Sequence, residues 1–451
     1  MGVDLVQVNP KGSNHRQEIL SSGTIGPDLR QYLIEGGRKN METRFPKSDA
    51  AYEAGKKVIP GGVIGTRRPE NFVPGAYPLY VKEGRGAHFK DLDGNEYIDY
   101  LAGFGPVLLG HAYEAVDNAA IERIRRGFCF DLSQDIQNTL AEKVIEFIPC
   151  AERVLFVLSG SDATTAAIRL ARTYTGRDKI LKFGYNGWHD WCVPVPTGIP
   201  ARAREDIIPF TYNDIASVET TMEKHKGQVA AIILTPLAHE YHHPLEFPKD
   251  GFLQKLRDIT KAEGTLLIFD EVRTGFRLAR GGAQEYFGVT PDIGVFGKAI
   301  GNGYPIGVVA GSNNVMMANQ EAYISSTFFY NSFPMTAALA VLNEIEGKNV
   351  IQHIWRLGEK LQKGMKDLLS KYEIPAEVSG PPPMPFLTFK SDPQKKHQVR
   401  RRIFFTEAIA NGVFVHPFHH WYIIYTHTDE DIEKTLAVME KAMMKIEAQV
   451  L

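Results

Sequence analysis

Cysteine is scarce in this chain of 451 residues, which contains only Cys129, Cys150 and Cys192. Their odd number and the absence of CxxC spacing argue against a disulfide framework and against a zinc ribbon. We therefore expect no metal site. The same scarcity fits a reducing compartment, so a cytoplasmic location is expected.

The chain also lacks a charge excess, a long apolar run and a targeting segment. Lys and Arg number 51 against 53 Asp and Glu, so no long-range attraction for nucleic acid or for an acidic membrane is expected. The longest apolar run, VAAIILTPLA at 229–238, is shorter than the roughly 18 residues that a membrane span needs. The first residues do not join a basic stretch to an apolar one. These absences leave small molecules as the expected partners.

The length and texture of the chain predict one large α/β domain and a smaller α+β domain. Residues 1–47 are polar and are interpreted as an N-terminal extension. Residues 48–115 combine a helical segment with a strand-rich one and form the N-terminal part of the small domain. Over 116–345, short apolar runs alternate with helical stretches, which is typical of a parallel sheet with crossover helices. Residues 346–451 are expected to complete the small domain.

Polar residues follow several of the expected strands, where an open parallel sheet binds its ligands. The run TLLIFD ends in Asp270, and DIGVFGK ends in Lys298. The run RVLFVLS ends in Ser159–Ser161 and opens an expected helix, whose free N–H groups suit a phosphate. The run DKILKF is followed closely by Tyr185 and Asn186. We expect these side chains to gather at one edge of the sheet.

Together these residues supply the parts of a pyridoxal phosphate site. The lysine suits a Schiff base, the acid suits the pyridine nitrogen, the helix N-terminus suits the phosphate and the aromatic suits a ring face. Each part taken alone has an ordinary explanation, such as a solvated loop lysine, a helix cap or surface packing. The combination predicts pyridoxal 5′-phosphate as the cofactor.

Three sequence blocks carry a family resemblance: LSGSDATTAAIRLARTYTGRDKI, IFDEVRTGFR and GGAQEYFGVTPDIGVFGKAIGNGYPIG. They resemble blocks of the class III aminotransferases, which are fold-type I enzymes dependent on pyridoxal phosphate. The resemblance covers nearly everything after residue 48 and is closest to the glutamate-1-semialdehyde aminomutase branch. It implies an α/β large domain built on a mostly parallel seven-stranded type of sheet, together with a small α+β domain.

The resemblance also implies roles for individual residues. Lys298 matches the Schiff-base lysine that moves the proton, and Asp270 matches the partner of the pyridine nitrogen. Val272 and Tyr185 match the residues on the two ring faces. Thr327 matches a threonine that reaches the phosphate from the neighbouring subunit, which implies a homodimer with shared active sites.

Two further implications concern the phosphate loop and its neighbouring motif. Ser159, Gly160 and Ser161 match the loop that the family usually writes SGT. Asn186 stands where the family has the histidine of its YHG motif, and we expect it to contact the cofactor too.

The substrate-reading positions depart from the aminomutase pattern. Arg68 survives as the expected carboxylate anchor, with Arg67 as the alternative, while Phe104 replaces a tryptophan. His419 lies in the block PFHHW, which replaces the segment that carries glutamate or arginine in relatives. We expect these residues to contact substrate.

The expected activity is transfer of an amino group to a keto acid such as 2-oxoglutarate or pyruvate. The expected donor is a β- or ω-amino acid, an amine, or an amino thioester such as a 3-aminoacyl-CoA. A glutamate-1-semialdehyde-type 2,1-aminomutase or a racemase is the alternative, because both use the same proton shuttle without a keto acid. A non-catalytic regulatory protein of the same fold is the second alternative.

Overall fold

The computed structural model describes residues 44–65, 67–240 and 243–450. The chain divides into two compact units. The first runs to Tyr80 and includes Asp91–Asp93, and the second contains Val81–Lys90 and everything from Gly94 onward. The four-part division expected from the sequence stays a prediction, and nearly all of its extension, residues 1–47, lies outside the described residues.

The first unit is organised by the start of helix α3 (Pro46–Gly55). The carboxylate of Asp93 accepts a hydrogen bond from the backbone N–H of Ser48 at 3.1 Å, which satisfies a donor that the helix leaves free. The buried hydroxyl of Ser48 in turn accepts from the N–H of Leu79 at 2.9 Å. A short 3-10 helix, η1 (Pro69–Asn71), follows along the chain.

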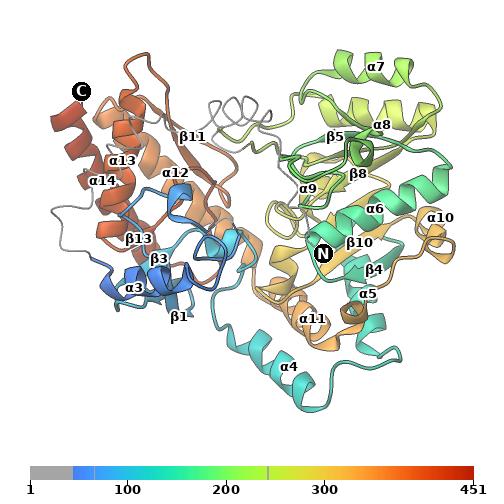
Figure 1. Cartoon of the computed structure of the whole chain (residues 1–451), viewed down its shortest axis with the longest axis horizontal. Coiled ribbons are helices and arrows are strands. Elements are labelled where there is room, and N and C mark those ends of the chain that lie inside the picture. The colour runs from blue at the N-terminus through green and yellow to red at the C-terminus, as the bar shows by residue number, and fades with distance from the viewer. Residues whose placement is uncertain (1–43, 66, 241–242, 451) are drawn as a thin grey trace, which may run out of the picture. The chain divides into compact units, whose positions relative to one another are not determined.

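A seven-stranded sheet forms the centre of the second unit (Figure 1). In spatial order its strands are β4 (Arg153–Val157), β10 (Gly307–Gly311), β9 (Ile293–Phe296), β8 (Leu266–Asp270), β7 (Val229–Leu234), β5 (Lys179–Phe183) and β6 (Ile207–Pro209). Strand β10 runs antiparallel to both of its neighbours, and the other pairs are parallel. The expected α/β class and mostly parallel sheet are confirmed.

Both faces of this sheet are covered, because its strands are apolar on both sides. Strand β7 shows the alternation. Ile233 packs in a cluster with residues of α6 (Gly160–Thr175), whereas Ile232 packs with residues of α7 (Ile215–Lys224) and α8 (Phe252–Glu263). The other helices of this region are α4 (Glu114–Arg125), α5 (Ile136–Phe147), α9 (Gly282–Phe287), α10 (Asn313–Met316) and α11 (Ser332–Gly347).

A smaller α+β portion completes the second unit. Its four-stranded sheet has the order β1 (Val81–Arg85), β2 (His88–Asp91), β3 (Glu96–Asp99) and β13 (Val413–Phe414), and β13 lies parallel to β3. A hairpin joins β11 (Ala376–Ser379) to β12 (Phe386–Phe389). The helices are α12 (Val350–Lys371), α13 (Lys396–Ala410) and α14 (Asp429–Val450). Across the whole second unit, the short 3-10 helices are η2 (Ala102–Phe104), η3 (Ala201–Arg204), η4 (Lys298–Gly301), η5 (Met317–Gln320) and η6 (Thr327–Tyr330).

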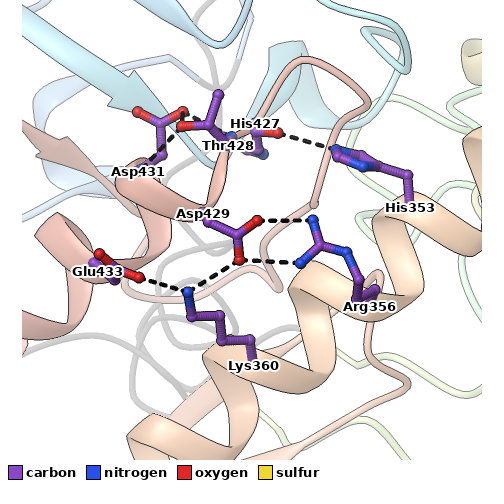
Figure 2. Close-up of polar contacts among 8 residues, drawn as sticks. All are labelled: His353, Arg356, Lys360, His427, Thr428, Asp429, Asp431 and Glu433. Carbon is purple, nitrogen blue, oxygen red and sulfur yellow. Dashed lines mark hydrogen bonds and ion pairs between the residues drawn. The ribbon is translucent and has the colours of Figure 1, made fainter.

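Ion pairs join α12 to the start of α14 (Figure 2). The guanidinium of Arg356 donates to both oxygens of Asp429, at 3.0 and 2.9 Å. Lys360 donates to Asp429 at 3.0 Å and to Glu433 at 2.7 Å. Exposed pairs such as these add little stability individually, but their geometry fixes the orientation of the two helices. Within the described residues, no helix joins the length and the apolar character that crossing a membrane requires.

Candidate active site

The site begins at two neighbouring parallel strands. Asp270 is the last residue of β8, and Lys298 follows β9 after one glycine. Asp270 pairs in register with Val295 of β9, so the two polar side chains leave the sheet at the same edge. Lys298 has a φ of 48°, in the left-handed region that side chains rarely adopt. This strained backbone is a feature that often accompanies functional sites.

Asp270 is a buried carboxyl group held by two donors. The side-chain amide of Asn186 donates to it at 2.8 Å, and the N–H of Val272 donates at 3.2 Å. Burial raises the pKa of Asp270, and the hydrogen bond from Asn186 opposes that rise, as does the positive charge of Arg273. These donors favour the carboxylate form that a cationic ring nitrogen requires.

Lys298 lies in surroundings that disfavour its charge. Desolvation lowers its pKa well below the usual value, and the positive charge of Arg273 lowers it further. Among the described residues, its ammonium has no hydrogen-bond or ion-pair partner within reach. Near neutral pH, the side chain of Lys298 is therefore a neutral amine more often than that of an exposed lysine. The neutral amine is the nucleophilic form.

The N-terminus of α6 lies close to these two residues. Ser159 caps the helix, because its hydroxyl accepts from the N–H of Asp162 at 3.3 Å. Gly160 lies against Val272 so closely that a Cβ there would meet two Val272 methyl carbons at 2.9 Å. Gly297, next to Lys298, also lies near Val272. The free N–H groups of a helix start therefore sit beside the strand ends.

The loop after β5 is tied to the same helix. The hydroxyl of Thr164 donates to the backbone carbonyl of Asn186 at 2.7 Å, and the N–H of Trp188 donates to the hydroxyl of Ser161 at 3.3 Å. Gly187 has a φ of 119°, and a Cβ there would meet the Ser161 hydroxyl oxygen at 2.7 Å. Tyr185 remains partly exposed in this loop. The residues predicted for phosphate and ring contacts are thus brought together.

A second group of side chains, made of aromatic and imidazole rings, packs together. Phe104 lies edge-on to His419, with 5.2 Å between ring centroids. The rings of His419 and His420 are stacked at 4.2 Å, and His239 meets both of them edge-on, at 5.0 and 4.5 Å. The predicted pair of Phe104 and His419 is therefore together, and sequence reasoning missed His239, which comes from a distant loop after β7.

Two buried or half-buried arginines were also missed, although both lie in the block IFDEVRTGFR. Arg273 lies 5.7 Å from the ring centroid of Tyr185 and influences the pKa of both Asp270 and Lys298. Arg277 is fully buried, donates to the carbonyl of Gly105 at 2.5 Å, and has its pKa lowered to about 10 by burial. The position of Arg273, three residues past a strand-end acid, was the available signal.

Two further predicted residues are exposed. Arg68 is an exposed residue of the first unit, where its guanidinium packs against Gly61, and its role as a carboxylate anchor stays a prediction. Thr327 begins η6 and is exposed. Its role toward a neighbouring subunit also stays a prediction.

The family model of the class III aminotransferases matches residues 73–443. The chain is a class III aminotransferase. A 3-aminobutyryl-CoA aminotransferase from Cloacimonas acidaminovorans (strain Evry) is 42% identical over 405 residues, which cover 89% of this chain and 98% of the relative. A glutamate-1-semialdehyde 2,1-aminomutase from Acetivibrio thermocellus is 37% identical, over 86% of this chain and 96% of the relative.

Solved structures agree with this assignment. The FumI protein from a Sphingopyxis species, in its pyridoxal phosphate internal aldimine form, has a TM-score of 0.86 at 30% identity and covers 90% of this aminotransferase and 98% of its own chain. An omega-transaminase from Sphaerobacter thermophilus has a TM-score of 0.80 at 27% identity, with coverages of 92% and 99%. The family and these neighbours show that the enzyme uses pyridoxal phosphate to move an amino group between an amino donor and a keto acid.

The residues present fit this cofactor. A buried carboxylate, a lysine without an ion-pair partner and a capped helix start meet at one edge of the sheet. The side-chain carbonyl oxygen of Asn186 is buried and has no hydrogen-bond partner among the described residues. Gly160 and Gly187 keep space open at the site, because a Cβ at either position would lie less than 3.0 Å from neighbouring side-chain atoms.

Proposed function

We propose that this aminotransferase takes its amino group from a β-amino acyl thioester of the 3-aminobutyryl-CoA kind and transfers it to 2-oxoglutarate or pyruvate. One observation carries the choice of donor. His419 and His420, which are buried and neutral, occupy the segment that carries glutamate or arginine in relatives, so no arginine stands there to bind a second carboxylate of the donor. The 42% identity to a 3-aminobutyryl-CoA aminotransferase supports the same donor class.

The residues that would hold the cofactor are assigned as follows. Lys298 would bind its aldehyde carbon, and Asp270 would face its pyridine nitrogen. Val272 and Tyr185 would cover the two ring faces, and Asn186 holds Asp270 in place. Ser159, Gly160 and Ser161, at the start of α6, would bind its phosphate. When bound, pyridoxal phosphate accepts the electrons of the broken C–H bond.

The proton transfer falls to Lys298. Its lowered pKa favours the neutral amine, which would accept the proton from the donor's substituted carbon and later give that proton up. Arginine does not serve here, because its guanidinium keeps its proton.

We further propose a homodimer in the cytoplasm. Exposed aromatic residues lie near Thr327 in the sequence, namely Tyr323, Phe328 and Tyr330. Large apolar side chains left exposed in one segment favour an interface with a second copy. A neighbouring copy packed there would receive the Thr327 hydroxyl at its own phosphate site. Analytical ultracentrifugation of the holoenzyme tests the dimer, and a monomer that is fully active would contradict it.

A donor panel tests the main proposal. Purified enzyme with pyridoxal phosphate is mixed with 3-aminobutyryl-CoA, 3-aminobutyrate, a simple amine or glutamate-1-semialdehyde, and the absorbance of the cofactor is followed. We expect the thioester to convert the cofactor to its amine form fastest. Equal or faster conversion by the free amino acid would contradict the thioester assignment.

The second candidate is a 2,1-aminomutase, which the relative from Acetivibrio thermocellus favours. An aminomutase, like a racemase, gives product without a keto acid. Incubation of the donors without any keto acid, followed by product analysis, separates these activities from transamination. The non-catalytic alternative has no support from the family assignment.

A further inference from the structure

Two different kinds of polar group surround Lys298, and the mechanism above uses neither. One is the guanidinium of Arg273. The other is a cluster of three imidazoles, His239, His419 and His420, called the histidine cluster below. An aminotransferase must bind two different substrates in one place, so two kinds of recognition group are informative.

The guanidinium of Arg273 is a candidate binding group for an anion. It lies 5.7 Å from the centroid of the Tyr185 ring. Among the described residues it has no carboxylate in ion-pair range and no side-chain hydrogen bond. Its charge lowers the pKa of Lys298, of Asp270 and of all three members of the histidine cluster, so it lies within electrostatic range of each of them. A guanidinium in this position offers a fork for the carboxylate of a keto acid.

The histidine cluster is buried and short of partners. Its members are 7%, 5% and 0% exposed for His239, His419 and His420, respectively. Both ring nitrogens of His239 and both of His420 are buried without a hydrogen-bond partner among the described residues. The Nδ1 of His419 is 2.7 Å from the carbonyl of His420. Unpaired buried polar groups carry a free-energy cost, which a bound ligand relieves.

The chemistry of the cluster suits an uncharged oxygen. Burial and the charge of Arg273 hold all three imidazoles in the neutral form. A neutral imidazole has one N–H that donates to a carbonyl, but it brings no charge to offset the desolvation of a carboxylate.

A metal ion is the competing occupant. The ligand nitrogens lie within 4.8 Å of one another, which is compatible with a shared ion. However, the positive charge of Arg273 acts on all three imidazoles. No carboxylate belongs to the cluster in the described part of the chain to balance a dication. The local charge therefore opposes a metal.

We propose that Arg273 binds the carboxylate of the keto acid while His239 and His420 of the histidine cluster donate to the uncharged acyl oxygen of the amino donor. This assignment of one substrate to Arg273 and the other to the histidine cluster rests on the proposed function, since it assumes a thioester donor. It lets one site accept an anionic and an uncharged group in turn without moving an arginine out of the way.

The two half-reactions separate the two roles. Holoenzyme in the aldehyde form is mixed with 3-aminobutyryl-CoA, and enzyme in the amine form is mixed with 2-oxoglutarate, each in a single turnover. We expect Arg273→Gln to lower kcat/KM for 2-oxoglutarate roughly 10- to 100-fold, with a much smaller effect on the thioester. We expect His420→Phe to lower kcat/KM for the thioester roughly 5-fold and to spare the keto acid.

Conservative variants keep the test independent of folding. Arg273→Lys retains the charge and should recover part of the keto acid reaction. His420→Asn retains a neutral donor and should recover part of the thioester reaction, and His239→Phe gives a second loss of the cluster. Circular dichroism and cofactor content confirm that each variant is folded and loaded.

Three outcomes would overturn the inference. Equal losses in both half-reactions for Arg273→Gln and His420→Phe would show a general structural role. Stoichiometric zinc in the wild-type enzyme that is lost in His420→Phe would make the cluster a metal site. Wild-type enzyme that reacts with 2-oxoglutarate but with no thioester would remove the donor half while leaving the transaminase intact. A wild-type enzyme inert in both half-reactions would instead refute the proposed function itself.

Discussion

Removal of one hydrogen bond to Asp270 gives a measurable loss of cofactor affinity. Asn186→Ala deletes the amide that donates to the buried carboxylate at 2.8 Å, leaving the N–H of Val272 at 3.2 Å as the remaining donor. A hydrogen bond to a charged group contributes about 1.5–3 kcal/mol. Because Asn186 opposes the rise in the Asp270 pKa, its loss also favours the protonated acid, which cannot hold a cationic ring nitrogen.

The expected result is a roughly 10- to 100-fold higher dissociation constant for pyridoxal phosphate, measured by fluorescence titration of apoenzyme. Asn186→Leu is the matched control, because it fills the space without a donor and should lose as much affinity as the alanine variant. Asn186→His supplies an N–H donor and should recover part of it. Wild-type affinity in Asn186→Leu would refute the reasoning.

Two further predictions concern packing and pH. Gly160→Ala places a Cβ 2.9 Å from two methyl carbons of Val272, so we expect about 1–3 kcal/mol less stability by urea unfolding and weaker cofactor binding. Gly347→Ala, in open space and without a left-handed φ, is the matched control, and equal effects of the two substitutions would contradict the contact. Burial alone would raise the pKa of Asp431, but hydrogen bonds from His88 and Thr428 lower it to about 2 from 3.8. Its contribution of about 2 kcal/mol is therefore full above pH 3.8 and is lost as the pH falls through about 2. Asp431→Asn should be less stable than wild type near neutral pH, with the difference disappearing in acid; a difference that persists there would exclude the ionised carboxylate as its cause.

The strands of the seven-stranded sheet and the polar residues at their ends could be predicted from local sequence pattern. Strands such as VAAIIL are buried on both faces, and this continuous apolar character is visible without tertiary information. Asp270 and Lys298 follow such runs, so their meeting at one edge of a parallel sheet could be expected from chain direction alone.

The contacts among the rings of His239, His419 and His420 could not be predicted from local sequence pattern. His239 lies after β7, while His419 and His420 lie far along the chain, and only the folded chain brings their rings within 5.0 Å. Arg273 was visible in the sequence, but whether a described carboxylate comes within ion-pair range of it is decided by three-dimensional packing. The low pKa of Lys298 likewise arises from burial and from Arg273 rather than from its neighbours in sequence.

Reduction of the holoenzyme with borohydride, followed by digestion and peptide mass spectrometry, tests the central claim most directly. The account predicts a single pyridoxyl adduct on Lys298 and none in Lys298→Ala, whose folding is checked by circular dichroism. Lys182 is the informative alternative, because burial also lowers its pKa. An adduct mapping to Lys182, or to any lysine other than Lys298, would contradict the account.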